Sequence, residues 1–239
     1  TRRSSDLDHP DAWSVLGEVL ESGGDLPGAV VALQKAADLD PGWAAVRSHL
    51  AYLELETGAL ARASRLIEQA FEIDDGDPEA CYTFAVLCEL ESDAERADRF
   101  YEVAAQVDPD RFHAPVRVSQ ERFEQMARMA MEVLPEKVRS FLGDVPVVIQ
   151  DLPERDQRGM FANNAPLLLG ECIGTHMEQR GALDLADLTP ARIMLYKRNL
   201  ERACRDEEDL EEQVTITVLH EVLHFLGLDE DEVGARGLG

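Results

Sequence analysis

The sequence predicts an all-α repeat solenoid followed by a small α+β domain, within a chain of 239 residues. A pattern of small and apolar residues returns at a period of about 34 residues through the first half. Short apolar runs that suit β-strands follow in the second half. A long helical pattern then carries a His-Glu-x-x-His motif at residues 220–224. With 45% hydrophobic and 30% charged residues, both halves can bury a core.

Repeated helix–turn–helix units account for the first half. Aligning Pro10, Ala44 and Pro78 as first positions places small residues at the same points of each unit, where they let paired helices approach closely. Proline cannot continue a helix, so Pro41 and Pro109 are expected to end the second helices of their units. The matching small residues are Gly17, Ala51 and Ala85 in the first helices, and Ala29, Ala63 and Ala97 in the second helices.

Over residues 10–111 this pattern resembles the tetratricopeptide repeat, in three units. The resemblance implies a curved solenoid that binds a peptide or another protein on its concave face. Members that grip a C-terminal carboxylate use lysine, arginine and asparagine on that face. Here the first helices carry glutamates instead, namely Glu18, Glu21, Glu54 and Glu89. A carboxylate clamp is therefore not expected, and the partner is not identified.

A linking region is expected over residues 112–142. Apolar spacing predicts a long helix from about Val116 to Leu142, which Pro135 kinks or divides in two. This helix would cap the solenoid. The second domain then covers residues 143–239, and the helix from about residue 119 contributes to it.

The second domain is expected to contain a small sheet with helices packed against it, which makes it α+β. Strands are predicted at residues 145–149, 167–170 and 192–196, and residues 151–166 are predicted to form a surface loop. The strand near residues 192–197 is expected to offer its backbone as an edge for an extended peptide.

Two helices are predicted after the last strand. Asn199 is expected to cap a short helix at residues 200–204. The final helix is predicted to run from near Asp206 to Leu226, because an acidic first turn favours the start of a helix.

The chemistry of the chain is expected on this final helix. His220 and His224 are four positions apart, so they project from one face about one turn apart. Two imidazoles at this spacing can bind one zinc ion. Glu221 points in an adjacent direction and can take the proton of an attacking water without binding the metal. The structural alternative is a buried helix whose histidines only make hydrogen bonds.

A third zinc ligand is expected just after this helix, because catalytic zinc sites usually have three protein ligands. Gly227 can adopt a positive φ and end the helix, which turns the chain back toward the metal. Glu230 then lies where the extended motif places its third ligand. Asp229 and Asp231 flank it, so the identity of this ligand stays open among the three acids.

Residues from about 130 to 233 resemble the minimal zincin-like metallopeptidases of bacteria. The matching segments are Leu134–Glu136, Val147–Ile149, Leu167–Gly170, Ile193–Arg198 and Thr217–Glu230. The resemblance implies a peptidase fold, and the matching positions suit His220, His224 and Glu230 as metal ligands and Glu221 as the catalytic residue. The family usually has aspartate where Glu230 stands.

Other reactive side chains are weaker candidates. Tyr196 and His176 could each donate a hydrogen bond to an oxyanion, although a structural role is favoured for both. Nothing in the sequence places a base beside Cys172. Cys81 and Cys88 fall at core positions of a repeat helix, which suits packing better than metal binding.

Charge and cysteine content restrict the partners and the compartment. A net charge of −25 argues against nucleic acid and anionic membranes as partners. Four cysteines without a CxxC pair suit reduced thiols in a cytosol. No apolar run is long enough to span a membrane and no signal peptide is visible. A cytoplasmic location is therefore expected, while the oligomeric state is not predicted.

Two functions fit these features. The leading hypothesis is a zinc-dependent endopeptidase whose repeat domain recruits a substrate or a regulator. The alternative is a tetratricopeptide adaptor protein whose zincin-like domain has lost catalysis. The intact Glu221 favours the enzyme, because an inactive site would be free to lose it.

Overall fold

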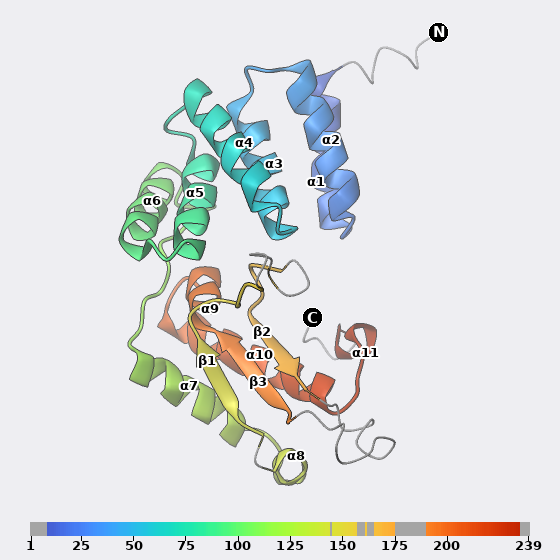
Figure 1. Ribbon diagram of the computed structural model, residues 1–239, viewed down its shortest axis with the longest axis vertical. Helices are drawn as coiled ribbons and strands as arrows, with labels where there is room; N and C mark the ends of the chain where they lie inside the picture. Colours follow the sequence, from blue (N-terminus) through green and yellow to red (C-terminus); the bar gives the residue numbers. More distant parts are fainter. Residues whose placement is uncertain (1–8, 144, 157–160, 162–164, 175–189, 235–239) are drawn as a thin grey trace. The chain divides into compact units, whose positions relative to one another are not determined.

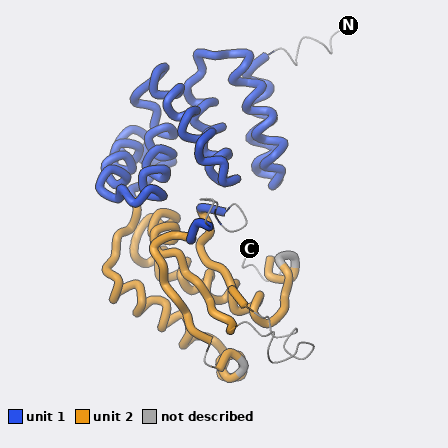
Figure 2. Tube along the Cα trace, viewed as in Figure 1, with its two compact units in different colours: residues 1–114, 154–166 blue, residues 115–153, 167–239 orange. Residues whose placement is uncertain are grey.

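The computed structural model describes residues 9–143, 145–156, 161, 165–174 and 190–234, and only the backbone of Phe141, Glu230 and Asp231. A helix-rich repeat region precedes a smaller region of strands and helices, so the predicted fold class is confirmed (Figure 1). The chain divides into two compact units, residues 1–114 with 154–166 and residues 115–153 with 167–239 (Figure 2). None of the described helices is both long and apolar enough to cross a membrane.

Helix pairs build the described part of the first unit. The pairs are α1 (Pro10–Ser22) with α2 (Leu26–Leu39), α3 (Ala44–Glu56) with α4 (Leu60–Ile73), and α5 (Pro78–Leu90) with α6 (Ala94–Val107). Aspartates cap several of these helices: the carboxylates of Asp25, Asp77 and Asp93 each accept a hydrogen bond from a backbone N–H of the first turn. Pro41 and Pro109 follow the ends of α2 and α6, as predicted.

Small side chains at the matching repeat positions are buried between paired helices, as the period predicts. Ala29, Ala63 and Ala97 are fully buried. A Cβ atom added at Gly17 would lie 2.8 Å from Cγ of Leu33, so a larger residue would push α1 away from α2.

The turn inside each helix pair contains one residue in the left-handed region. Gly24 and Gly58 hold this place in the first two pairs, with φ of 79° and 78°. Ser92 holds it in the third pair with φ of 66°. Only glycine adopts this conformation without a steric cost, so the third turn stores backbone strain that the other two lack.

Cys81 and Cys88 lie in the core of the first unit, as predicted. Burial, followed by the charge of Asp77, raises the pKa of Cys81 to about 11. Burial also raises the pKa of Cys88. Both thiols therefore stay protonated near neutral pH, and neither is a ready metal ligand or nucleophile.

Two of the glutamates expected on the concave face are buried instead. Glu89 is 2% exposed and accepts a hydrogen bond from the hydroxyl of Tyr101 at 3.0 Å. Glu54 is 4% exposed and lies 2.9 Å from Arg62 in an ion pair. These two carboxylates stabilise the interior of the repeats, so their assignment to the concave face was wrong.

The second unit contains a three-stranded sheet in the order β1-β3-β2. The strands are β1 (Val147–Gln150), β2 (Gly170–Ile173) and β3 (Arg192–Tyr196). Strand β3 pairs in parallel with β1 and antiparallel with β2. The expectation that the strand near residues 192–197 offers a free edge is therefore wrong, because both sides of β3 are already paired.

The helices of the second unit differ from prediction at several boundaries. They are α7 (Gln120–Glu132), α8 (Glu136–Leu142), α9 (Lys197–Ala203), α10 (Glu207–Phe225) and α11 (Glu230–Gly234). The predicted long helix divides at Pro135, and Ser119 caps the start of α7. Asn199 is not a cap: it is fully buried within α9, where its Nδ2 donates to the carbonyl of Leu168 at 2.7 Å.

Helices α7 and α10 share one buried cluster with one face of the sheet. Alternation along β3 places Ile193 and Leu195 on the same face. Both join Phe123 and Met126 of α7 and Val218 of α10 in one buried cluster. The apolar side of α10 is thus held in the core.

A buried carboxylate fastens the chain before α7 to α9. Glu201 is fully buried, and its carboxylate accepts hydrogen bonds from the Lys197 ammonium, from Arg117 at 3.0 Å and from the backbone N–H of Val118 at 3.0 Å. The Glu201 carbonyl also accepts from the backbone N–H of Val116 at 2.8 Å. These hydrogen bonds hold residues 116–118, where the apolar pattern predicted the start of a helix.

Replacing Glu201 by alanine is expected to destabilise the second unit by about 3–5 kcal/mol, because Lys197 would remain buried without its counter-charge. Urea unfolding of the full chain, followed by circular dichroism, measures the shift in midpoint. The matched control is Glu212→Ala, which removes an exposed carboxylate from α10 and should change stability by less than about 0.5 kcal/mol. Equal effects of the two substitutions would contradict a stabilising role for the buried group.

Candidate metal centre on helix α10

Helix α10 begins where the sequence predicts and is held by one apolar side. The carboxylate of Asp206 caps it by accepting a hydrogen bond from the backbone N–H of Asp209 at 2.9 Å. The fully buried residues of the helix are Leu210, Val214, Val218, Val222 and Phe225. The motif residues His220, Glu221 and His224 therefore lie on a helix that is anchored in the core by its apolar side.

The two motif histidines face each other. Their Nε2 atoms lie 2.9 Å apart, and the rings meet edge to face with centroids separated by 4.5 Å. Nδ1 of His224 also lies 2.9 Å from the carbonyl oxygen of Leu228. A carbonyl only accepts, so Nδ1 of His224 carries a proton, and in the neutral ring Nε2 then keeps a lone pair. This is the arrangement in which an imidazole binds a metal through Nε2.

The Leu228 carbonyl is a site group that the sequence reasoning missed, and Gly227 brings it into place. Gly227 has φ of 100°, as predicted, and ends the helix. The backbone N–H of Leu228 then donates to the carbonyl of Leu223 at 3.1 Å, which closes the turn. The chain thus folds back so that the Leu228 carbonyl reaches the His224 ring.

Among the three acids considered as a third ligand, Asp229 has another role in the structure. Asp229 accepts a hydrogen bond from the backbone N–H of Glu232 at 2.9 Å, and Glu232 accepts one from the backbone N–H of Asp229 at 3.2 Å. This reciprocal pair is a capping box for α11, so the Asp229 carboxylate already has a structural use. The side chains of Glu230 and Asp231 lie outside the described residues, although the backbone places Glu230 at the start of α11.

Glu221 is buried, at 6% exposure, and Gly170 of β2 packs beside it. A Cβ atom added at Gly170 would lie 2.7 Å from Cγ2 of Thr217 and 3.4 Å from Cγ of Glu221. Only a residue without a side chain lets the strand come this close to the helix. The first residue of the edge strand β2 is therefore adjacent to the proposed catalytic group, a contact that the sequence did not reveal.

The histidine pair fits a zinc ion by its chemistry. Neutral imidazole nitrogens bind zinc at about 2.0–2.1 Å, and two such ligands of a tetrahedral ion lie roughly 3.3 Å apart. The observed separation of 2.9 Å between the Nε2 atoms is close to this value. Within the described part of the chain, no third His, Cys, Asp or Glu side chain joins this pair.

The weaker candidates are not gathered into this centre. The Tyr196 side chain is buried, and its hydroxyl donates a hydrogen bond to the carboxylate of Glu171. Cys172 is half-buried in β2 and packs against the core of the unit. His176 lies outside the described residues.

Family comparison supports both resemblances noted in the sequence. Residues 142–238 match the zincin-like metallopeptidase family, and residues 20–80 match the tetratricopeptide repeat. The two matches occur along the chain in the predicted order. The first suggests a metallopeptidase, and the second suggests interaction with other proteins.

Solved structures and curated proteins add little to these family matches. Two crystal structures of MamA are similar over 44% of this chain, with 19% and 20% sequence identity and a TM-score of 0.38 in each case. The similar regions cover 61% and 57% of the MamA chains, so this chain spans less than two thirds of either. Comparison with curated proteins found no match.

Proposed function

We propose that this protein is a zinc-dependent endopeptidase whose repeat unit recruits a protein substrate or regulator. One observation carries the proposal. The Nε2 atoms of His220 and His224 face each other at 2.9 Å on a helix that also carries the buried Glu221. The family matches support the coarser parts of this function, a metallopeptidase domain and a protein-interaction repeat.

In this proposal His220 and His224 hold the ion through Nε2, and Glu230 is the third ligand. Bound zinc supplies a Lewis acid that polarises the scissile carbonyl and makes water a stronger acid. The hydrogen bond from His224 Nδ1 to Leu228 keeps Nε2 directed toward the ion.

Glu221 is the proposed proton carrier. It would accept a proton from the attacking water and transfer it to the departing amine, which general acid–base catalysis requires. The stem of Glu221 packs beside Gly170 of β2, and this contact restricts the positions open to its carboxylate. A restricted carboxylate is better placed for repeated proton transfer than a mobile one.

Strand β2 is the proposed binding edge for an extended substrate, in place of β3. Among the described strands, β2 lies at one edge of the sheet and begins beside Glu221. Backbone groups along the outer side of an edge strand can pair with an added peptide strand. Substrate bound in this way would pass close to the histidine pair.

Metal content and chelation test the proposed function. We expect the purified 239-residue chain to contain close to one zinc ion per molecule by mass spectrometry. Cleavage of an unfolded polypeptide such as casein should stop with a chelator and return when zinc is added. Protein that neither retains zinc nor cleaves would instead support the adaptor alternative.

Substitution of each acid in turn tests the third ligand. Glu230→Ala is expected to weaken zinc affinity by at least about 10–100-fold, because even loss of a group that only supports a ligand has an effect of this size. Asp229→Ala should keep parental affinity, since its carboxylate caps α11. Zinc titration with a competing chelator measures both. Loss of affinity in Asp231→Ala, with Glu230→Ala unchanged, would move the ligand to residue 231.

A further inference from the structure

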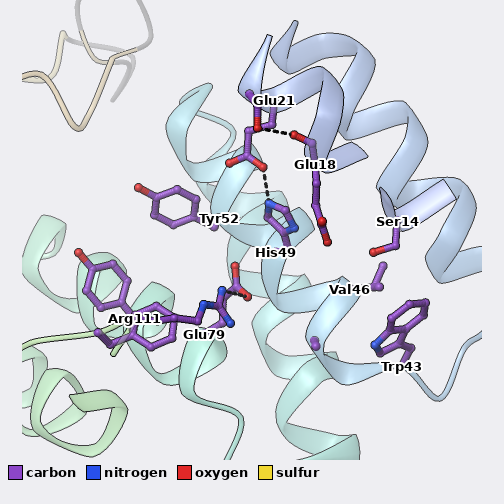
Figure 3. Close-up of a pocket in the computed structure, with 13 residues that line it drawn as sticks. Ser14, Glu18, Glu21, Trp43, Val46, His49, Tyr52, Glu79 and Arg111 are labelled. Carbon is purple, nitrogen blue, oxygen red and sulfur yellow. Dashed lines mark hydrogen bonds and ion pairs between the residues drawn. The ribbon is translucent and has the colours of Figure 1, made fainter. Parts of the chain in front are cut away.

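The first helices of the described repeats line a groove in the first unit (Figure 3). The groove encloses about 910 Å³. Aromatic side chains form part of its wall. The ring of Tyr82 lies 5.1 Å from that of Phe112 and 6.5 Å from that of Tyr52, measured between centroids. With Trp43 farther along the groove, these rings give any occupant an apolar surface to contact.

Carboxylates line the same groove. Glu18, Glu21 and Glu79 contribute negative charge, whereas Arg111 and His49 are the basic residues of its described lining. A carboxylate oxygen of Glu21 lies 2.6 Å from Nε2 of His49, and one of Glu79 lies 3.1 Å from the Arg111 guanidinium (Figure 3). Three carboxylates thus face two basic side chains, so acidic groups outnumber basic groups in the described lining.

Burial and nearby charges both act on the carboxylates of this region. Burial, followed by the charge of Glu21, raises the pKa of the neighbouring Glu56. Burial also raises the pKa of Glu79, although His49 and Arg111 act to lower it. A positive charge added here would favour the ionised carboxylates, so the groove is complementary to a cation.

The groove is long enough for several residues of a peptide. Helices α3 and α5 pack directly together, and the axes of packed helices lie about 8–10 Å apart, so a groove that also includes α1 is longer than about 10 Å. An extended chain advances about 3.3 Å per residue, so at least about three residues fit along this length. Arginine and lysine can lay their stems on aromatic rings while their charged ends reach carboxylates.

We propose that this groove binds an extended peptide segment that carries arginine or lysine side chains. Glu18, Glu21 and Glu79 pair with the charged ends, and the aromatic rings contact the stems. The proposal rests on the recruiting role given to the repeat unit above, and it specifies the chemistry of the recruited segment.

Fluorescence anisotropy with the full chain tests this inference. The probe is a short labelled glycine–serine peptide with several arginines, compared with peptides that carry citrulline or glutamate at the same positions. Citrulline keeps the shape of arginine without its charge. We expect the arginine peptide to bind at least about tenfold more tightly than the citrulline peptide, and to weaken as salt is raised. A chelator is present throughout, so the result does not depend on hydrolysis.

Charge-neutral variants locate the binding. Glu18→Gln combined with Glu21→Gln, and separately Glu79→Gln, should each weaken binding by about three- to tenfold. The control combines Glu68→Gln with Glu102→Gln, at exposed positions of α4 and α6 outside the groove, and should change affinity less than about twofold. Circular dichroism checks that each variant keeps its helices. Failure of the arginine peptide to bind, equal binding of the glutamate peptide, or equal losses in control and groove variants would overturn the proposal.

Discussion

Replacing Glu221 by glutamine is expected to abolish peptide hydrolysis while zinc content and fold are kept. The amide has nearly the same size as the carboxylate, so the contact with Gly170 should survive. It cannot accept a proton from water, and the loss of a general base lowers rates by roughly 10²–10⁴-fold. Cleavage of a fluorogenic peptide and zinc content, both measured on the same preparation, check the two expectations.

The control for this substitution is Glu212→Gln, which makes the same chemical change at an exposed position of the same helix. It should cleave at the parental rate. Parental activity in Glu221→Gln would exclude Glu221 as the proton carrier. Loss of zinc in that variant would give Glu221 a role in holding the metal instead.

Alanine at His220 or at His224 is expected to remove stoichiometric zinc and all zinc-dependent cleavage. Each substitution takes away one of the three proposed ligands, and two remaining ligands do not make an ordinary protein zinc site. The unit should stay folded, because the buried side of α10 holds it in place. Zinc content after gel filtration and the circular dichroism spectrum measure these outcomes.

His9→Ala is the matched control, because it removes an exposed histidine from the first unit. Its zinc content should equal that of the parent. Full zinc occupancy in both His220→Ala and His224→Ala would contradict the metal centre. Unfolding of either variant would show instead that the ring contact stabilises the helix.

The repeat architecture was predictable from sequence because its determinants are local and recur. Alanines and glycines at fixed spacing fall between paired helices, and Ala29, Ala63 and Ala97 are all fully buried. The helix that carries the motif was predictable for a similar reason, since Asp206 marks its start and Gly227 its end. Signals of this kind depend only on residues that are close together in the sequence.

The errors came from contacts between distant parts of the chain. Separate apolar runs do not reveal the strand order, and the prediction that β3 is an edge strand is wrong for this reason. The region before α7 has helical spacing, yet Glu201 binds the backbone N–H of Val118 across a separation of 83 residues. Asparagine is a residue type that often caps helices, but Nδ2 of Asn199 donates its hydrogen bond to the Leu168 carbonyl. In each case a tertiary partner outweighed a local preference.

The candidate site was predicted only in part for the same reason. The spacing of His220 and His224 indicated a shared ligand face, and their Nε2 atoms do face each other. Gly170 could not be found, because its role depends on the approach of β2 to α10. The spacing of Asp229 and Glu232 does contain a capping-box signal. This signal favours a structural role for Asp229 and leaves Glu230 and Asp231 as candidates for the third ligand.

Because the core holds the apolar side of α10, the backbone positions of His220 and His224 should be fixed without a bound ion. A zinc finger, by contrast, folds only as it binds its metal, so that its binding energy is also its folding energy. In the proposed site, metal exchange would take place within the native state, and zinc should add stability only by mass action. Amide protons of Val218 and Val222 should therefore exchange slowly with and without chelator, because their opening requires unfolding of the whole unit.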